Sequence, residues 1–558
     1  MLRNLQNVLR RSLAEGYRLS IVTEETELCL RALRSHSRTT TTASSTASST
    51  ASSTTKTTIF APCTIPNLMR NEPVPTNSSA AVCVLRISGP ASLAVLETMT
   101  RTPSRAFSPN QLYVRNLYHP RTRALLDVNA LVAFFRAPAS FTGEPVAELH
   151  VHGSTAVVQD VIEALTTGFG SDVQPAQPGE FSRRAFYNGK MDLLQVESLG
   201  DMLTAETQAQ KNAALGVYTR GDELVQVWRS GMVRARARVE AVIDFGEEDE
   251  LNLAEEVIKT VEEVKGLMDA ILERLQAVPS AEIVQGGLRV VLLGAPNVGK
   301  SSLLNVLTRD AHALVSPLPG TTRDVLERFV DLGGHKVVLV DGAGLRGEDE
   351  NGGGPAMTDA SHAALEAEGM KRIVSRAGEA HVVVVIDACC PNDGAAGEAG
   401  EALQANARVR AEVARLEGAG KDIIWVKNKV DLMDGVDIDA DADTRRIYMS
   451  CRTGAGVDRF LERLKELVLK KTGLYETGGT SPTSVPIMYK ARHVRHLRCA
   501  ANALERFLDI VDPADPASRL ELAAEELRIA ATELAEITGG IDLEDVLDDM
   551  MTRFCIGK

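Results

Sequence analysis

The sequence is poor in aromatic residues, and it lacks several features that mark particular classes of protein. Only 4% of its 558 residues are Phe, Trp or Tyr, so its cores must be built mainly from aliphatic side chains. No apolar run reaches the roughly 18 residues of a membrane-spanning helix. The eight cysteines form no C-x-x-C pair, which excludes the common zinc-site and disulfide-scaffold patterns. A net charge of −14 argues against a protein that coats nucleic acid nonspecifically, while a local basic face can still bind RNA.

The first 58 residues differ in composition from the rest of the chain. They contain seven Arg and one Lys against four Glu, a net charge of +4, so the remaining residues carry −18. The segment MLRNLQNVLRRSLAEGYRL places apolar residues along one helical stripe with arginines between them, which is typical of a mitochondrial transit peptide. The stretch TTTTASSTASSTASSTTKTT that follows is predicted to be disordered. The alternative is an unstructured tail without a targeting role. We favour the transit peptide.

The strongest motif is a phosphate-binding loop in the middle of the chain. An apolar strand, Val290–Leu293, is followed by GAPNVGKS and then by a helical pattern, which is the context that a P-loop requires. Glycines let backbone N–H groups approach the phosphates, Lys300 reaches the β- and γ-phosphates, and Ser301 binds Mg²⁺. The residues expected to contact the nucleotide here are Gly294, Asn297, Val298, Gly299, Lys300, Ser301 and Ser302.

Three further motifs follow in the order of a GTP-binding domain. A second apolar strand ends in DGAG, where Asp341 can hold the Mg²⁺ water shell and Gly344 can donate an N–H to the γ-phosphate. The Asp431 carboxylate of NKVD can accept hydrogen bonds from both guanine N1–H and N2–H₂, which adenine lacks, so the motif selects GTP. The remaining base-contacting residues are expected to be Asn428, Lys429, Ser450, Cys451 and Arg452. These motifs predict a Ras-like GTPase domain at residues 287–473, with a parallel sheet wrapped by helices.

The catalytic residue of this domain is less obvious. Ras-type enzymes place a Gln directly after the DxxG glycine to orient the attacking water, but here that position is Leu345. The carboxylates of Glu366 and Glu368 in the following segment are the candidates to replace it. From charge alone, a solvated helix face is the better interpretation of both.

The chain ends in FCIGK, and its cysteine has the spacing of a prenylation box. Prenylation favours Ser, Met, Gln, Ala, Leu or Phe at the last position, whereas this box ends in Lys558 and contains Gly557. A lipid anchor is therefore disfavoured. A buried thiol and a chemical role both remain open for Cys555.

Several motifs outside the nucleotide site resemble the MnmE/TrmE family of tRNA-modification GTPases. They are LRISGP at 85–90, SFTGEPVAELHVHG at 140–153, QPGEFSRRAFYNGKMDL at 177–193, GTTRDV at 320–325 and the terminal FCIGK. The resemblance extends over nearly everything after residue 58. Two departures stand out: the segment TIPNLMRNEPVPTNSSAAVCV replaces the family's shorter glycine-paired turn, and Gly342 replaces the usual Thr of DTAG.

The resemblance implies an α/β plus α+β architecture, and the length of the chain predicts roughly three to four domains. Residues 1–58 would be the transit peptide and disordered segment, and 59–188 the α+β domain that binds a tetrahydrofolate and forms a homodimer. Residues 189–286 and 474–558 would form one helical domain, with the GTPase domain 287–473 inserted between its halves. The residues Leu520, Ala523, Leu527, Ala531, Leu534 and Ile537 support the helical part independently, because they recur at helical spacing until Gly539-Gly540.

The family also implies roles for individual residues. Arg86, Glu148, Lys190 and Lys558 would bind the folate, and Cys555 would be the candidate for chemistry on its one-carbon unit. His150 and His152 share a strand face, but two ligands are too few for a metal site, so they are interpreted as ordinary strand residues. Thr322 would bind Mg²⁺, and Glu366 would be the catalytic carboxylate. A K⁺ ion in place of an arginine finger would be held by Asn297, Ser316, Leu318 and Thr321.

The resemblance implies a K⁺-dependent GTPase of the mitochondrial matrix that modifies carbon 5 of the wobble uridine in certain tRNAs. It would act with an FAD-dependent MnmG-like partner and take a one-carbon unit from 5,10-methylenetetrahydrofolate. Two alternatives stay open. One is a GTPase switch in mitochondrial ribosome assembly without modification chemistry. In the other, the N-terminal domain serves only as a folate-binding dimerisation module.

Overall fold

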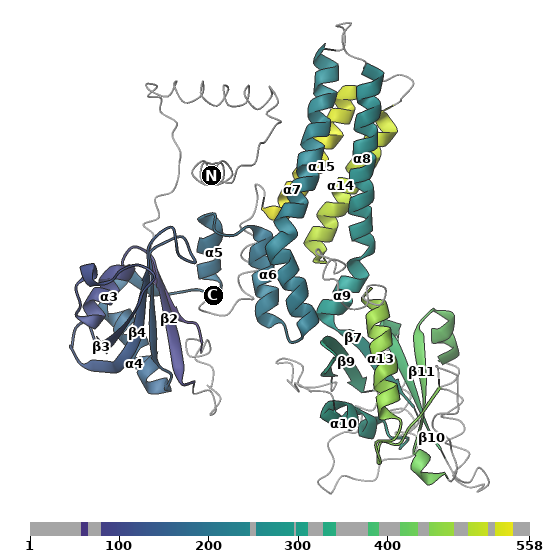
Figure 1. Cartoon of the computed structure of the whole chain (residues 1–558), viewed down its shortest axis with the longest axis horizontal. Coiled ribbons are helices and arrows are strands. Elements are labelled where there is room, and N and C mark those ends of the chain that lie inside the picture. The colour runs from purple at the N-terminus through teal and green to yellow at the C-terminus, as the bar shows by residue number, and fades with distance from the viewer. Residues whose placement is uncertain are drawn as a thin grey trace, which may run out of the picture. The chain divides into compact units, whose positions relative to one another are not determined.

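Two six-stranded sheets and a group of long helices make up the described part of the chain (Figure 1). The computed structural model describes residues 57–64, 80–245, 253–294, 297–310, 327–341, 378–389, 413–433, 446–473, 489–511 and 519–539. These residues all follow Lys56 and belong to one compact unit. Within these ranges, no helix combines the length and the hydropathy that crossing a membrane requires.

The first sheet has the strand order β3-β4-β5-β2-β1-β6 and is antiparallel except where β1 pairs with β6. Its strands are β1 (Thr58–Pro62), β2 (Val82–Ser88), β3 (Leu112–Tyr118), β4 (Leu125–Phe135), β5 (Val146–His152) and β6 (Val173–Pro175). The helical segments around it are α3 (Ser92–Thr100), η2 (Ser104–Ala106), α4 (Thr155–Gly168), η3 (Gly170–Asp172) and α5 (Glu180–Tyr187). Successive residues of a strand face opposite sides, so Leu85 and Leu149 enter the core with α3 and α4 while Arg86 and Glu148 lie on the other face.

The second sheet has the order β12-β11-β10-β7-β9-β8 and is parallel except for the β8–β9 hairpin. Its strands are β7 (Leu288–Leu293), β8 (Glu327–Leu332), β9 (His335–Asp341), β10 (Val382–Ala388), β11 (Asp422–Asn428) and β12 (Arg446–Tyr448). The helical segments beside it are α10 (Lys300–Asp310), η4 (Val430–Leu432) and α13 (Val457–Lys471). Residues 382–386 of β10 are all buried, which a strand needs when both faces of its sheet are covered. The mixed α/β fold is as predicted.

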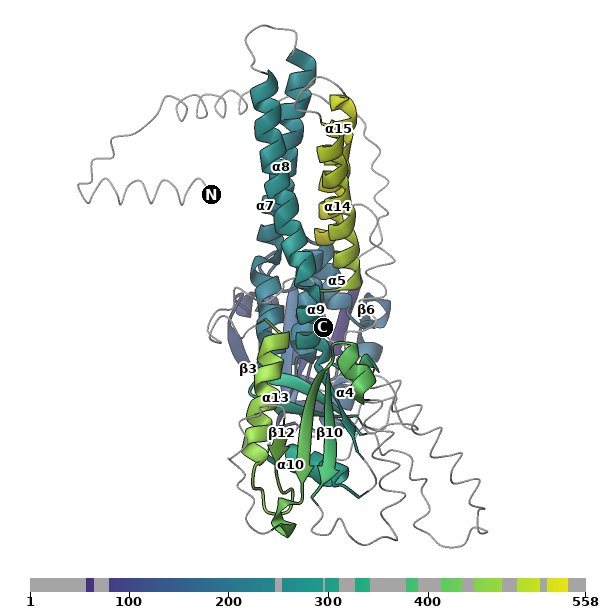
Figure 2. The ribbon, with the colours of Figure 1, turned by 90° about the vertical axis from the view of Figure 1, so that its right-hand side faces the viewer.

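The remaining described helices form most of a separate core. They are α6 (Leu193–Thr204), α7 (Gln208–Phe245), α8 (Leu253–Gln276), α9 (Val278–Gly286), α14 (Ala491–Ile510) and α15 (Leu520–Thr538). All of them except α9 contribute buried residues to one cluster, whereas Ile283 of α9 packs with the core of the second sheet. Two perpendicular views show α7, α8, α14 and α15 running side by side (Figures 1 and 2). Their buried side chains, among them Trp228, Val264, Leu504 and Leu527, form one cluster. Helices that precede and follow the second sheet in the sequence therefore pack together.

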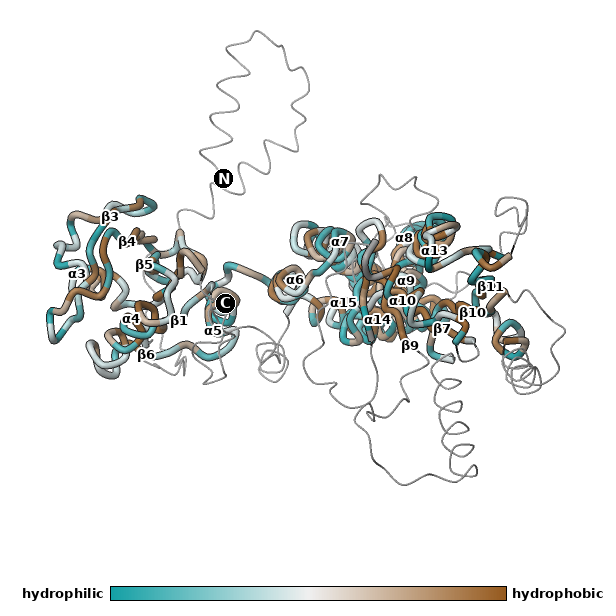
Figure 3. Tube along the Cα trace, turned by 90° about the horizontal axis from the view of Figure 1, so that it is seen from below, coloured by the Kyte–Doolittle hydropathy of each residue, from teal (hydrophilic) through white to brown (hydrophobic). Residues whose placement is uncertain are grey.

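The helix predicted from residue 520 onwards is confirmed. Five of its six stripe residues are buried and Ala531 is half-buried. The helix ends at Thr538, where Gly539 adopts a φ of 115° and donates its N–H to the Ala535 carbonyl. Figure 3 colours the chain by hydropathy and shows hydrophobic stretches, in brown, along β4 and around β7 and β9. The apolar residues Val546, Leu547, Met550, Met551 and Phe554 predict a further helix from about Asp542, which lies outside the described residues.

Candidate functional site

The predicted P-loop joins strand β7 to helix α10. The loop begins at Gly294, directly after β7, and α10 begins at Lys300. Lys300 folds back over the loop, and its Nζ donates to the Gly294 carbonyl at 2.9 Å. Asn297 has a φ of 62° and Gly299 a φ of 104°, so the backbone turns through the left-handed region at both positions. This is the type of turn in which consecutive backbone N–H groups converge on an anion.

Asn428 connects the P-loop to the loop that follows β12. It is 2% exposed, its Nδ2 donates to the Val298 carbonyl at 2.9 Å, and its Oδ1 accepts from the Cys451 N–H at 3.1 Å. A Cβ at Gly299 would lie 2.1 Å from the same Nδ2, so only glycine fits. The side chain predicted to contact the base thus also holds two loops of the nucleotide site in register.

The predicted guanine-contacting residues lie together at the carboxyl ends of β11 and β12. The Ser450 Oγ donates to Asp431 Oδ1 at 2.6 Å, which orients the carboxylate. The backbone N–H of Arg452 donates to the same hydroxyl at 3.3 Å. Burial raises the pKa of the half-buried Cys451 thiol to about 11, so this side chain stays protonated at neutral pH. Among these residues, Asp431 therefore provides a carboxylate in a fixed orientation.

The metal-binding predictions are only partly within the described residues. Ser301 is the second residue of α10 and has an exposed side chain, as a Mg²⁺ ligand needs. Asp341 ends β9 and pairs with Leu292, so its backbone lies beside the start of the P-loop. The predictions for Ser316, Leu318, Thr321, Thr322, Gly344, Glu366, Cys555 and Lys558 fall outside the described residues.

On the first sheet, the structure brings together Arg86 and Glu148. They are cross-strand partners on β2 and β5, and Arg86 Nε lies 3.1 Å from Glu148 Oε1. His150 lies beside them with its Nε2 3.6 Å from Glu148 Oε2, too long for a hydrogen bond. His150 and then Arg86 hold the pKa of Glu148 below its usual value, against the effect of burial. The pair is thus ionised and fixed on the sheet face opposite the core. His152, the other histidine of the strand, instead contacts Asp127.

Two aromatic rings that the sequence did not single out lie against Arg86. Its guanidinium carbon is 4.8 Å from the centre of the Phe141 ring and 5.9 Å from that of Phe181, both within cation–π range. Lys190, which follows α5, contacts the loop that carries Phe141, because its Nζ donates to the Pro138 carbonyl at 3.1 Å. Phe141 belongs to the motif SFTGEP. Its contact with Arg86 could not be predicted, because the two residues are far apart in the sequence and Phe141 lies in a loop without a periodic pattern.

Comparison with known proteins gives two family matches and a set of full-length relatives. The model described as MnmE helical domain matches residues 193–555, and that described as GTP-binding protein TrmE N-terminus matches residues 73–190. The rat protein "5-taurinomethyluridine-[tRNA] synthase subunit GTPB3, mitochondrial" is 39% identical over 86% of this chain and 91% of its own length. The human protein of the same name is 38% identical over 86% and 90%. The "tRNA modification GTPase MnmE" of Chelativorans sp. (strain BNC1) is 38% identical over 86% and 96%.

Proposed function

This chain belongs to the MnmE/TrmE family of tRNA-modification GTPases, and from that premise we propose that it hydrolyses GTP to modify carbon 5 of the wobble uridine in certain tRNAs. The observation that carries the GTPase part is the arrangement around Asn428, which ties the P-loop to the base-contacting loop. The Arg86–Glu148 pair on the other sheet carries the folate part. The names of the GTPB3 relatives support a mitochondrial location, and the proposal further places the protein in the matrix.

The nucleotide site fits GTP with Mg²⁺. Backbone N–H groups of Gly294 to Ser302 and the Lys300 ammonium would bind the phosphates, and Asp431 would accept from the guanine edge. Ser301, Thr322 and the water shell at Asp341 would hold the metal, which neutralises charge on the β- and γ-phosphates. Glu366 takes the role of orienting the attacking water, in place of the Gln that position 345 lacks.

A potassium ion is proposed as the extra positive charge in hydrolysis. Asn297 would hold it together with Ser316, Leu318 and Thr321. The exposure of Asn297 on the P-loop and its φ of 62° support this proposal. Replacing K⁺ by Na⁺ at equal ionic strength is expected to slow GTP turnover about tenfold or more, the scale of a lost charge clamp. Equal rates in the two salts would show that the charge comes from elsewhere.

The first sheet is proposed to bind 5,10-methylenetetrahydrofolate. Arg86 and Lys190 would bind its carboxylates or ring carbonyl, Glu148 would accept from its N–H groups, and Lys558 would complete the pocket. Cys555 is the proposed residue for chemistry on the one-carbon unit. The proposal includes a homodimer through residues 59–188, an FAD-dependent MnmG-like partner, and tRNA as the substrate.

The proposed domain organisation follows the family. Residues 1–58 would be a transit peptide with a disordered segment, 189–286 and 474–558 the helical domain, and 287–473 the inserted GTPase domain. The shared core of α7, α8, α14 and α15 supports this, since it joins helices from before and after the second sheet.

Analysis of mitochondrial tRNA nucleosides by mass spectrometry tests the function directly. Cells that lack the gene are expected to lose the modified wobble uridine and to regain it with the wild-type chain. Cells complemented with Cys555→Ser are expected to stay unmodified, although the variant hydrolyses GTP normally, because serine keeps the volume but not the nucleophilic thiol. A deletion strain with fully modified tRNA and defective ribosome assembly would support the alternative function instead.

A further inference from the structure

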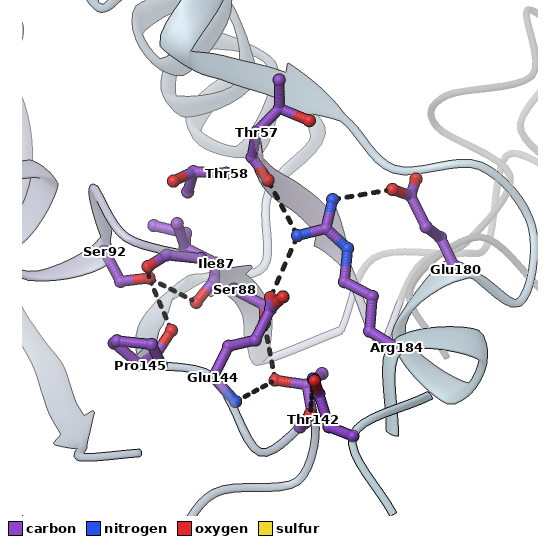
Figure 4. Close-up of polar contacts among 12 residues, drawn as sticks. Thr57, Thr58, Ile87, Ser88, Ser92, Thr142, Glu144, Pro145, Glu180 and Arg184 are labelled. Carbon is purple, nitrogen blue, oxygen red and sulfur yellow. Dashed lines mark hydrogen bonds and ion pairs between the residues drawn. The ribbon is translucent and has the colours of Figure 1, made fainter. Parts of the chain in front are cut away.

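A buried polar network connects the residue before β1, strand β2, the loop between β4 and β5, and helix α5 (Figure 4). Its centre is Arg184 on α5, whose side chain is only 14% exposed. Arg184 Nη1 donates to the Thr57 carbonyl at 2.8 Å and to Glu144 Oε2 at 3.0 Å, and its Nη2 donates to Glu180 Oε1 at 2.9 Å. One guanidinium thus joins the start of β1, helix α5 and the loop of residues 136–145 that connects β4 to β5.

Glu144 is the residue of the network that joins Arg184 to Ser88. Its side chain is 7% exposed, and the same Oε2 also accepts from the Ser88 hydroxyl at 3.0 Å. Ser88 Oγ lies 2.7 Å from Thr142 Oγ1, and the Asn188 amide donates to the Thr142 carbonyl at 2.7 Å. A buried carboxylate of this kind is stable only with its cation in place, since an unpaired buried charge is costly.

The network lies next to the Arg86–Glu148 pair on the same face of the sheet. Ser88 follows Arg86 by two residues on β2, so both side chains project from one face. The register places Ser88 opposite Val146 and Arg86 opposite Glu148, so the network is one repeat further along the same two strands.

The loop that the network fixes is also the one that touches the pocket residues. It carries Phe141, which lies over Arg86, and Pro138, whose carbonyl accepts from Lys190. At Gly143 the φ is +75°, and an added Cβ would lie 3.0 Å from the Asn188 Cβ and 3.2 Å from Lys190 Cγ. The loop therefore packs closely against the residues that follow α5, and a shift of α5 moves both.

The geometry points to Arg184 as a positioning residue of the Arg86–Glu148 pocket. By joining β1, α5 and the loop, Arg184 holds Phe141 over Arg86 and sets the place of Lys190. Its role is to position the loop and not to bind a ligand itself. That the ligand of these residues is a folate rests on the proposed function, whereas the role of Arg184 in fixing the loop does not.

Hydrogen exchange of the full-length protein without ligand tests the positioning itself. Arg184→Lys keeps the charge but cannot reach three acceptors in a fork, so exchange in residues 137–145 is expected to rise about tenfold or more. Arg184→Met combined with Glu144→Gln removes both charges of this buried pair together, so the Glu144 carboxylate is not left unpaired, and should loosen the loop further. Arg105→Lys, an exposed arginine of the same fold, is the control. Unchanged loop exchange in both Arg184 variants would overturn the proposal.

Titration with 5-formyltetrahydrofolate, a stable reduced folate, tests the consequence. The variants should bind it about tenfold more weakly or worse, with Arg184→Lys between the wild type and the double variant, while GTP hydrolysis stays unchanged. A structural arginine without this role would lower the unfolding temperature and leave the affinity of the folded fraction intact. Loosened loops with wild-type affinity would also overturn the proposal.

If the wild-type protein itself fails to bind the folate, the folate part of the proposed function falls, while the exchange result still decides the role of Arg184.

Discussion

Asp431 is the residue proposed to select the guanine base. Ser450 orients its carboxylate through a hydrogen bond of 2.6 Å. Asp431→Asn places an NH₂ donor where guanine N2–H₂ also donates, whereas xanthine presents a carbonyl oxygen there. We expect GTP affinity to fall at least about a hundredfold and xanthosine triphosphate to become the better substrate. Hydrolysis rates with both nucleotides measure this, with the exposed Asp458→Asn as the control. An Asp431→Asn protein that still prefers GTP would contradict the assignment.

Glu197 is a residue whose ionisation matters for folding and not for chemistry. It lies on α6 with 4% of its side chain exposed, and it accepts from Arg492 Nε at 3.2 Å and Nη2 at 3.0 Å. His493 Nε2 contacts its other oxygen at 2.5 Å. Burial alone would raise the pKa of Glu197, but His493, Arg492 and Lys490 lower it to about 2. The folded state thus strongly favours the carboxylate.

The pH dependence of stability should report this carboxylate. Because the folded pKa is depressed, the ionised Glu197 contributes stability above the unfolded pKa of 4.5 and loses it as the pH falls toward about 2. At about 1.4 kcal/mol for each pKa unit, the contribution at neutral pH is about 3 kcal/mol. Glu197→Gln should therefore destabilise the helices at pH 7 and approach wild-type stability near pH 2.5. Urea unfolding followed by circular dichroism measures it. Glu525→Gln, which breaks an exposed pair with Arg528, should have little effect at any pH.

At the scale of elements, the P-loop requires the backbone at Gly299 to lie very close to the side chain of Asn428. Gly299→Ala would place its Cβ 2.1 Å from Asn428 Nδ2 and push that side chain off both of its loops. We expect GTP affinity to fall about tenfold or more. Gly420→Ala is a matched control, because Gly420 also has a positive φ, 75°, but nothing within 4 Å of an added Cβ. It should cost about 1 kcal/mol of stability and leave GTP binding unchanged. Equal losses of affinity would attribute the effect to backbone strain alone.

Elements with a local signal were predictable from the sequence, and contacts between distant segments were not. The stripe of α15 and its glycine stop are visible because helix period and capping are local properties. The strand predicted at Val290–Leu293 begins two residues earlier, at Leu288, because Leu288 and Arg289 pair with Val337 and Val338. Arg289 interrupts the apolar run, so the pairing was not visible.

The same distinction applies to the sites. The P-loop and NKVD motifs are contiguous, and their geometry follows from short stretches of backbone. The contact of Phe141 with Arg86 and that of Arg184 with Thr57 join residues that are far apart in the sequence. No periodicity encodes such contacts. Family resemblance indicated Arg86 and Glu148, but the network that holds the loop over them became visible only in three dimensions.

At the scale of the whole molecule, the β8–β9 hairpin links the nucleotide site to the helices. Its turn accepts a hydrogen bond at the Gly334 carbonyl from the N–H of Ala209, in the first turn of α7, at 2.9 Å. Lys336 on β9 lies 2.6 Å from Glu206, in the corner between α6 and α7. The other end of β9 is Asp341, the proposed Mg²⁺ residue. We therefore expect a shift of β9 during GTP hydrolysis to be transmitted directly to the start of α7.

Breaking this link should separate GTP hydrolysis from tRNA modification. Lys336→Glu places two carboxylates against each other at the corner. We expect GTP affinity and basal hydrolysis to stay within about twofold of wild type, because Lys336 lies at the end of β9 opposite Asp341. Wobble-uridine modification in complemented cells should fall several-fold, since the helices no longer follow the hairpin. The exchanged pair, Glu206→Lys with Lys336→Glu, restores the opposite charges and should recover modification. Lys211→Glu, at an exposed position near the start of α7, is the control for the same change of charge without the ion pair. If the single variant modifies tRNA as well as wild type, or if the exchanged pair fails to recover, the hairpin does not transmit the nucleotide state.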